Sequence, residues 1–255
     1  MVIRSEQIKA FEQDALRRFE DEMVRHSKDV SPRLSEVLGG AQLRVAVRAA
    51  LARAQTYGFT NRGPARLFVE MMFLCGSSFD TDPQYPGISE ALRAPEDQMI
   101  RAEKIHQGQL EYVEKVSGPG AMNVHAALRD LAVFASQPLP FDSANLTSGM
   151  LAEMRRLFPK KAEHAGDAAL QALIGESRSD CLKYGFSTVR QMALIAVLKF
   201  GFGHGCTHDP LYPWIENTLQ DPRIVSPEAR AARLENKART WLDHVNARNE
   251  RRTKT

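Results

Sequence analysis

The stretch YGFTNRGPARLFVEMMFLCGSSFDTDPQYPGISEALRAP, residues 57–95, recurs as YGFSTVRQMALIAVLKFGFGHGCTHDPLYPWIENTLQDP, residues 184–222. The two align without a gap, the second beginning 127 residues after the first. Their identities concentrate in aromatic, Gly and Pro residues, such as Tyr57/Tyr184 and Gly76/Gly203, which rarely match by chance. Self-similarity at a fixed spacing indicates a repeated structural element. We therefore expect an internal duplication, with a first unit at residues 1–118 and a second unit at residues 140–250.

Apolar periodicity within each unit predicts helices. In residues 5–28 and 41–56 the apolar side chains recur three and four positions apart, as on one face of a helix. Residues 63–76 are apolar on nearly all sides, which indicates a buried central helix entered through Pro64. The matching segment of the second unit is 188–203. Short helices should follow at residues 86–93 and 213–220.

The segment between the units, residues 119–139, contains one more amphipathic helix, followed by a short linker with Pro138 and, just beyond the segment, Pro140. A linker this short favours two packed halves over freely tumbling domains. No β pattern is evident. The sequence thus predicts an all-α protein of about ten to twelve helices, with its halves related by a pseudo-two-fold axis or stacked as a superhelix.

Composition favours a cytoplasmic globular protein. The 255 residues are 43% hydrophobic and 25% charged, and the net charge of +3 is too small to indicate nucleic acid by itself. The start of the chain lacks an apolar leader, and no window resembles a membrane span. Three cysteines without paired spacing indicate a reducing compartment. The final residues, with a basic tail at 251–255, are expected to be solvated and disordered; Arg248, Arg251, Arg252 and Lys254 cluster there.

The stretch GFGHGCTHDPLYPW, residues 201–214, contains the most reactive side chains of the chain. In an extended backbone, His204, Cys206 and His208 would lie on one face. With Asp209 they could form a metal site, or a thiol nucleophile with a neighbouring base. The first unit has Ser77, Phe79 and Thr81 at these positions, so the set is not part of the repeat. We expect no metal or cofactor, and keep a metal-dependent or thiol enzyme as the alternative.

The residues that the two loops share predict a structural role. A Gly should end each buried helix, an Asp should accept backbone N–H bonds at the next turn, and a Pro should restrict the chain. The structural residues are Gly76, Asp82, Pro83, Gly203, Asp209 and Pro210. The candidates for contact with a partner are His204, Cys206, His208, Asp80, Tyr85, Tyr212 and Trp214. The scattered histidines, among them His164, are expected at surface or boundary positions.

Four features carry a resemblance to a known family: the helix segment Gln7 to Phe11, the Tyr57-Gly58 turn, the buried helix Phe68 to Gly76, and the loop Phe79 to Pro83. With them the chain resembles small helical accessory proteins of bacterial type VI secretion and related contractile-injection loci. In the second unit Cys206-Thr207 replaces Phe79-Asp80. The resemblance implies a non-enzymatic adaptor or chaperone for a secreted effector, or an immunity protein. The implied partner is a secreted effector or a spike component. Composition argues against a membrane, and the small net charge disfavours a nucleic acid.

Overall fold

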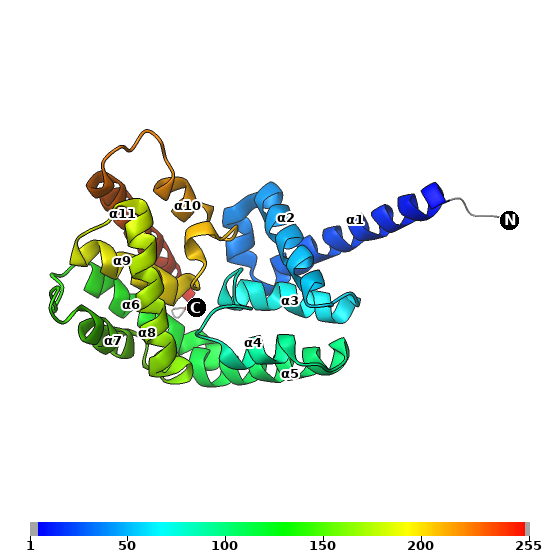
Figure 1. The fold of residues 1–255 in the computed structure, drawn as a ribbon, viewed down its shortest axis with the longest axis horizontal. Coiled ribbons are helices and arrows are strands. Elements are labelled where there is room, and N and C mark those ends of the chain that lie inside the picture. Colours follow the sequence, from blue (N-terminus) through cyan, green and yellow to red (C-terminus); the bar gives the residue numbers. More distant parts are fainter. Residues whose placement is uncertain (1–4, 253–255) are drawn as a thin grey trace.

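The computed structural model describes the backbone of residues 5–252 and the side chains of residue 11, residues 13–247 and residue 249. Within this range it contains eleven α-helices, a few short 3-10 and π turns and no strand, which confirms the all-α prediction (Figure 1). The helices are α1 (Ser5–Val30), α2 (Pro32–Thr56), α3 (Arg62–Cys75), α4 (Pro86–Arg93), α5 (Gln98–Tyr112), α6 (Met122–Ala135), α7 (Leu146–Leu157), α8 (Pro159–Tyr184), α9 (Val189–Phe202), α10 (Pro213–Leu219) and α11 (Pro227–Arg252).

The helices form where the apolar pattern predicts them. The stripe Leu43, Val47 and Leu51 of α2 is buried, and α3 is buried on almost every side. Helices α2, α4, α8 and α10 each have Pro in their first turn, where the missing N–H has no helical partner to lose.

The backbone conformation repeats at the 127-residue interval of the sequence. Helices α3 and α9 both end before a glycine with φ +96°, and α4 and α10 begin at Pro86 and Pro213. Two kinks that the sequence did not reveal also correspond, with Gly39 at φ 71°, ψ 164° and Gly166 at φ 77°, ψ 161°. The two halves therefore agree in backbone conformation at these positions, and their descent from a duplication stays a prediction.

The buried apolar residues form three clusters among the described residues. The first fills the first unit and is closed by Leu211 of the second. The second lies between α7, α8 and α9 and includes Phe134 of the connecting segment and Phe141 at the start of the second unit. The third lies beneath α10 and α11. Tyr212, in the loop before α10, packs against both the first and the third cluster.

The end of the chain corrects one prediction. The backbone of residues 246–252, expected to be disordered, continues α11 up to Arg252. The Asn249 side chain is buried and accepts a hydrogen bond from Arg33, 3.0 Å away. This contact joins the last turns of α11 to the start of α2. The predicted basic residue Lys254 lies outside the described residues.

Candidate functional site

The two loops that the repeat singled out lie against each other at the junction of the units. Gly76 and Gly203 meet there, each with φ +96°. A Cβ on Gly76 would come within 2.5 Å of the Phe202 carbonyl oxygen, and one on Gly203 within 2.8 Å of the Cys75 carbonyl oxygen. Only glycine tolerates both the backbone conformation and this approach. The glycines therefore allow the units to touch, in addition to ending the helices.

Asp82 and Asp209 tie the loops together reciprocally. The Oδ1 atom of each accepts a backbone N–H two residues later in its own loop, as predicted. The Oδ2 atom crosses to the other unit: Asp82 accepts the His204 N–H at 2.7 Å, and Asp209 accepts the Ser77 N–H at 2.8 Å. His204 and Ser77 are themselves 127 residues apart. The exchange supports a pseudo-two-fold relation over a superhelical stack.

Burial of Asp209 raises the pKa of its carboxyl, while the N–H groups of Ser77 and Leu211 oppose the shift by stabilising the charged form. This carboxylate is occupied by backbone donors on both oxygens. Asp209 therefore holds backbone groups in place. Its bond to Leu211 lies within its own loop, whereas its bond to Ser77 reaches the first unit, which the sequence did not indicate.

The reactive side chains of the second loop do not share a face, which corrects the expectation of an extended backbone. Residues Cys206–His208 form a 3-10 turn instead. Cys206 is fully buried in the third cluster, and burial raises the pKa of its thiol well above the usual range. His204 lies between Glu176 (Nδ1 to Oε2, 3.1 Å) and Thr81 (Nε2 to Oγ1, 3.1 Å). His208 contacts Glu216 and Lys183.

The position of Cys206 has a packing explanation. In the first unit the buried pair is Cys75 and Phe79, and at the equivalent positions of the second unit the order is reversed, Phe202 and Cys206. A small and a large side chain have exchanged places four residues apart. The buried Cys206 thiol therefore serves as a small apolar group, and it lacks the exposure that a nucleophile requires.

No group of three or more His, Cys, Asp or Glu in the described part of the chain is arranged to hold a metal ion. His204, Cys206, His208 and Asp209 each have separate surroundings. The structure therefore does not bring these four residues together, as a metal-dependent or thiol enzyme built on them would require.

Burial also separates the candidates for partner contact. Asp80 is 0% exposed and bonds to Arg53 (2.6 Å) and Tyr57 (2.7 Å), so it cannot contact a partner, and neither can Cys206. Tyr85 is 2% exposed, and its side chain lines the cavity between α4 and α5. Tyr212 and Trp214 are partly buried against Phe202. Of the predicted set, His208 offers the most exposed side chain.

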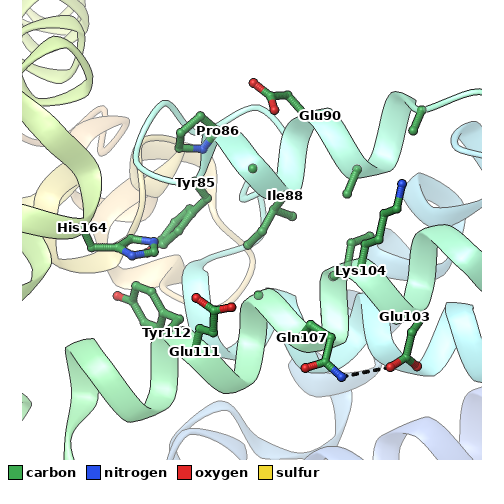
Figure 2. A pocket seen from close by; sticks show the side chains of 15 residues that line it. Tyr85, Pro86, Ile88, Glu90, Glu103, Lys104, Gln107, Glu111, Tyr112 and His164 are labelled. Atoms are coloured by element: carbon green, nitrogen blue, oxygen red, sulfur yellow. Dashed lines mark hydrogen bonds between the residues drawn. The ribbon is translucent and has the colours of Figure 1, made fainter.

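A cavity of about 630 Å³ lies between α4 and α5, next to Tyr85 (Figure 2). Its floor is formed by the buried side chains Tyr85, Ile88, Ile105 and Tyr112. His164 of α8 closes one end, with its ring edge-on to Tyr112 at 5.1 Å between centroids. Glu90, Glu103 and Glu111 are among its lining residues, and Figure 2 shows Glu90 and Glu103 on opposite sides of it, with Glu111 beside Tyr112. Sequence analysis placed only Tyr85 of these residues among its candidates.

A buried polar cluster lies behind this floor. Burial raises the pKa of the Cys75 thiol to about 12, an effect that Lys161 and Tyr85 oppose. Lys161 is 5% exposed and donates to the Phe200 carbonyl oxygen at 2.5 Å. Burial lowers its pKa, while Asp82 and Cys75 oppose that shift. Leu34 holds the equivalent position in the first unit, so the repeated fold does not itself require an amine here.

Sequence reasoning missed Tyr112, Lys161 and the role of His164, since nothing in their local pattern indicates which helices meet. One signal was available: Gly87 and Gly108 of the first unit stand where the second unit has Trp214 and Glu235. A glycine at one of two equivalent positions, where the other has a large side chain, indicates either a cavity or different packing at the glycine.

Comparisons with protein-family models, with curated proteins and with solved structures found no match. None of the described helices has the length and apolar content that crossing a membrane requires.

Proposed function

We propose that this protein is a non-enzymatic accessory factor that binds another protein through the first half of α1. The observation that supports it is an apolar stripe that continues beyond the body of the molecule. Met23 and Val24 of α1 are buried in the first cluster, and Phe19 packs against it. Further towards the N-terminus, Phe11 is 70% exposed and Leu16 is 46% exposed. Figure 1 shows this half of α1 projecting away from the other helices.

The second half of α1 is firmly held. Arg44 pairs with Asp21 at 2.6 Å, Arg48 with Glu20 at 2.9 Å, and His26 lies 2.6 Å from Glu70. A short helix without packing is marginally stable in water, because most helical stability in proteins comes from burial of an apolar face. An apolar groove on a partner would supply that burial in the helix-in-groove mode.

The class of partner rests on the resemblance to accessory proteins of contractile-injection loci. It favours a secreted effector or a spike component, with the protein acting as adaptor, chaperone or immunity protein. The alternative of a metal-dependent or thiol enzyme at His204, Cys206 and His208 is less well supported, because Cys206 is buried and the two histidines have different partners.

The test mixes the purified protein with the purified products of its neighbouring genes and measures binding by calorimetry. We expect one product to bind at micromolar concentration or tighter, and Phe11→Glu/Leu16→Glu to abolish binding while the thermal stability stays unchanged. The matched control is Leu182→Glu/Val225→Glu, at residues 81% and 85% exposed on other surfaces. The proposal fails if no product binds the wild type, or if the α1 variant binds as well as the control.

A further inference from the structure

Helix α6, which joins the two units, is incompletely packed on the helices beneath it. Its buried residues are Ala127 and Phe134. Three apolar cavities of about 60, 90 and 90 Å³ lie along its inner side, and Leu131 of α6 and Val197 of α9 line all three. Protein interiors contain few voids larger than a water molecule, and the atoms around a void lose the contacts that close packing provides. The inner face of α6 is therefore held less firmly than that of a close-packed helix.

The turn that leads into α6 is strained. Gly118 and Gly120 have φ values of 72° and 58°, and Ala121, directly before the helix, has φ 60°. Ala121 is the only non-glycine residue with a positive φ in the described part of the chain. In this conformation a Cβ crowds the backbone carbonyl oxygen, and glycine avoids that contact. The turn therefore stores strain in the observed position of α6, and a change of backbone conformation at Ala121 would release it.

The chain is anchored on both sides of α6. Before the turn, Val116 is 1% exposed in the first cluster. After the helix, Phe141 is buried in the second cluster against Gly149 of α7, where a Cβ would lie 2.4 Å from the Phe141 Cβ. The strained turn, α6 and the loop at residues 136–140 lie between these anchors. A movement of α6 therefore requires rotation only at the turn and at the loop.

Side chains of α9 and α11 hold the backbone of α6. The Arg190 guanidinium of α9 donates to the Ala135 carbonyl oxygen at 3.0 Å and is oriented by Glu235 of α11, with 3.2 Å between Nε and Oε2. Asn246 of α11 donates to the Leu128 carbonyl oxygen at 3.2 Å. The Arg190 side chain is 44% exposed, so water competes for its bonds at the C-terminal end of the helix.

Movement of α6 would expose an apolar surface. Ala238 of α11 lines one of the cavities together with Leu128 of α6, and Ala193 of α9 lines another together with Leu131. Ala193 is 3% exposed and Ala238 is 9% exposed. Burial of this surface favours the observed position of α6. A displaced position is thus a minor state, and the strain at Ala121 reduces the free-energy difference between the two.

We propose that α6 is a lid on the second unit, which opens as an intact helix by rotation at residues 118–121 and 136–140. In the closed position, which the structure shows, Ala121 is left-handed and α6 covers Ala193 and Ala238. In the open position the backbone of Ala121 relaxes and the apolar side chains of α9 and α11 are exposed. The strain therefore increases the open population over that of an unstrained turn. The lid lies away from the projecting half of α1, so it holds or fails independently of the proposed function (Figure 1).

The experiment places a thiol beneath the lid of the full chain and follows its alkylation by iodoacetamide with mass spectrometry, which resolves each cysteine. Ala193→Cys is the first reporter and Ala238→Cys the second, so the test survives if one variant does not fold. The native Cys75, Cys181 and Cys206 are buried and line none of the three cavities, so they report openings elsewhere. A thiol that reacts only in the open position reacts in proportion to the open population. We expect the reporter to react roughly tenfold faster than the native thiols or more, because local opening costs less free energy than global unfolding.

Ala121→Gly removes the strain and should slow alkylation of the reporter on the order of fivefold. Ala126→Gly, a matched exchange inside α6, should leave the rate unchanged, because the helix is intact in both positions of the lid. The lid is ruled out if the reporter reacts no faster than the native thiols, or if Ala121→Gly does not slow it. Faster alkylation in Ala126→Gly would show that α6 unfolds locally, which overturns rotation of an intact helix.

Discussion

At the scale of the residue, Tyr57 and Tyr184 occupy equivalent positions with different hydrogen bonding. The Tyr57 hydroxyl donates to Asp80 at 2.7 Å. Thr207 stands at the position of Asp80 in the second unit, and the buried Tyr184 hydroxyl has no hydrogen-bond partner among the described residues. Removing a paired hydroxyl costs stability, whereas removing a buried unpaired one removes a desolvation penalty.

We therefore expect Tyr57→Phe to lower the free energy of unfolding by about 1–2 kcal/mol. Tyr184→Phe should leave it unchanged or raise it slightly. Both values come from urea titration of the full chain, with each variant serving as control for the other. Equal losses at the two positions would contradict the hydrogen-bonding difference.

At the scale of the element, the helix ends at Gly76 and Gly203 depend on glycine for two reasons, the positive φ and the close approach of a carbonyl oxygen. Replacing either with alanine should cost more than about 3 kcal/mol. Gly201 lies two residues before Gly203, inside α9, and a Cβ there would meet nothing within 4 Å. Gly201→Ala should therefore stabilise the protein by roughly 0.5–1 kcal/mol. Thermal and urea unfolding measure the stability change of each variant. A small loss of stability in Gly203→Ala would refute the contact between the loops.

The same elements show what sequence can predict. The bounds of α4 follow from Pro86 and the apolar spacing, and those of α3 and α9 from unbroken apolar runs. The kink at Gly39 was missed, because a glycine pair alone does not separate a kink from a loop. The 3-10 turn at Cys206 was missed because alternation of residue types fits an extended strand as well.

The candidate site was predicted only in part. The structural roles of Gly76 and Asp82 are predicted from the residues shared between the loops; in the structure Gly76 follows the end of α3 and Asp82 accepts the Gln84 N–H. The crossing of Asp82 to His204 could not be predicted, because local spacing does not say which loops meet. The cavity could not be predicted either, because its lining residues come from α4, α5 and α8, and local spacing does not say which helices meet.

At the scale of the whole molecule, protonation of His204, at the junction of the two units, makes the folding stability depend on pH. Burial alone would lower the pKa of its imidazole, but hydrogen bonding to Glu176, together with the charges of Asp82 and Glu176, raises the pKa overall, while Lys199 opposes the rise. The folded state thus binds the proton more tightly than the unfolded chain. This contribution to stability is complete below the unfolded pKa of about 6.5 and is lost as the pH rises through the raised folded value.

We expect the stability difference between the wild type and His204→Gln to be larger at about pH 5.5 than at about pH 8.5. The change should be at most about 1 kcal/mol, since the Glu176 side chain is 38% exposed and solvent screens the pair. Urea titrations at both pH values give the comparison, and His244→Gln, at an exposed position of α11, is the control. A difference that grows with pH would refute the assigned sign.

The reciprocal bonds of Asp82 and Asp209 have a consequence for assembly. Each unit offers the same acceptor and the same N–H donor, and the two sets pair with each other across the junction. This is the form of an isologous interface, in which one self-complementary surface meets a copy of itself. A chain consisting of one unit would leave its Asp without the second donor, and a second such chain could supply it. The junction within this single chain is thus arranged as the interface between two copies of one unit would be.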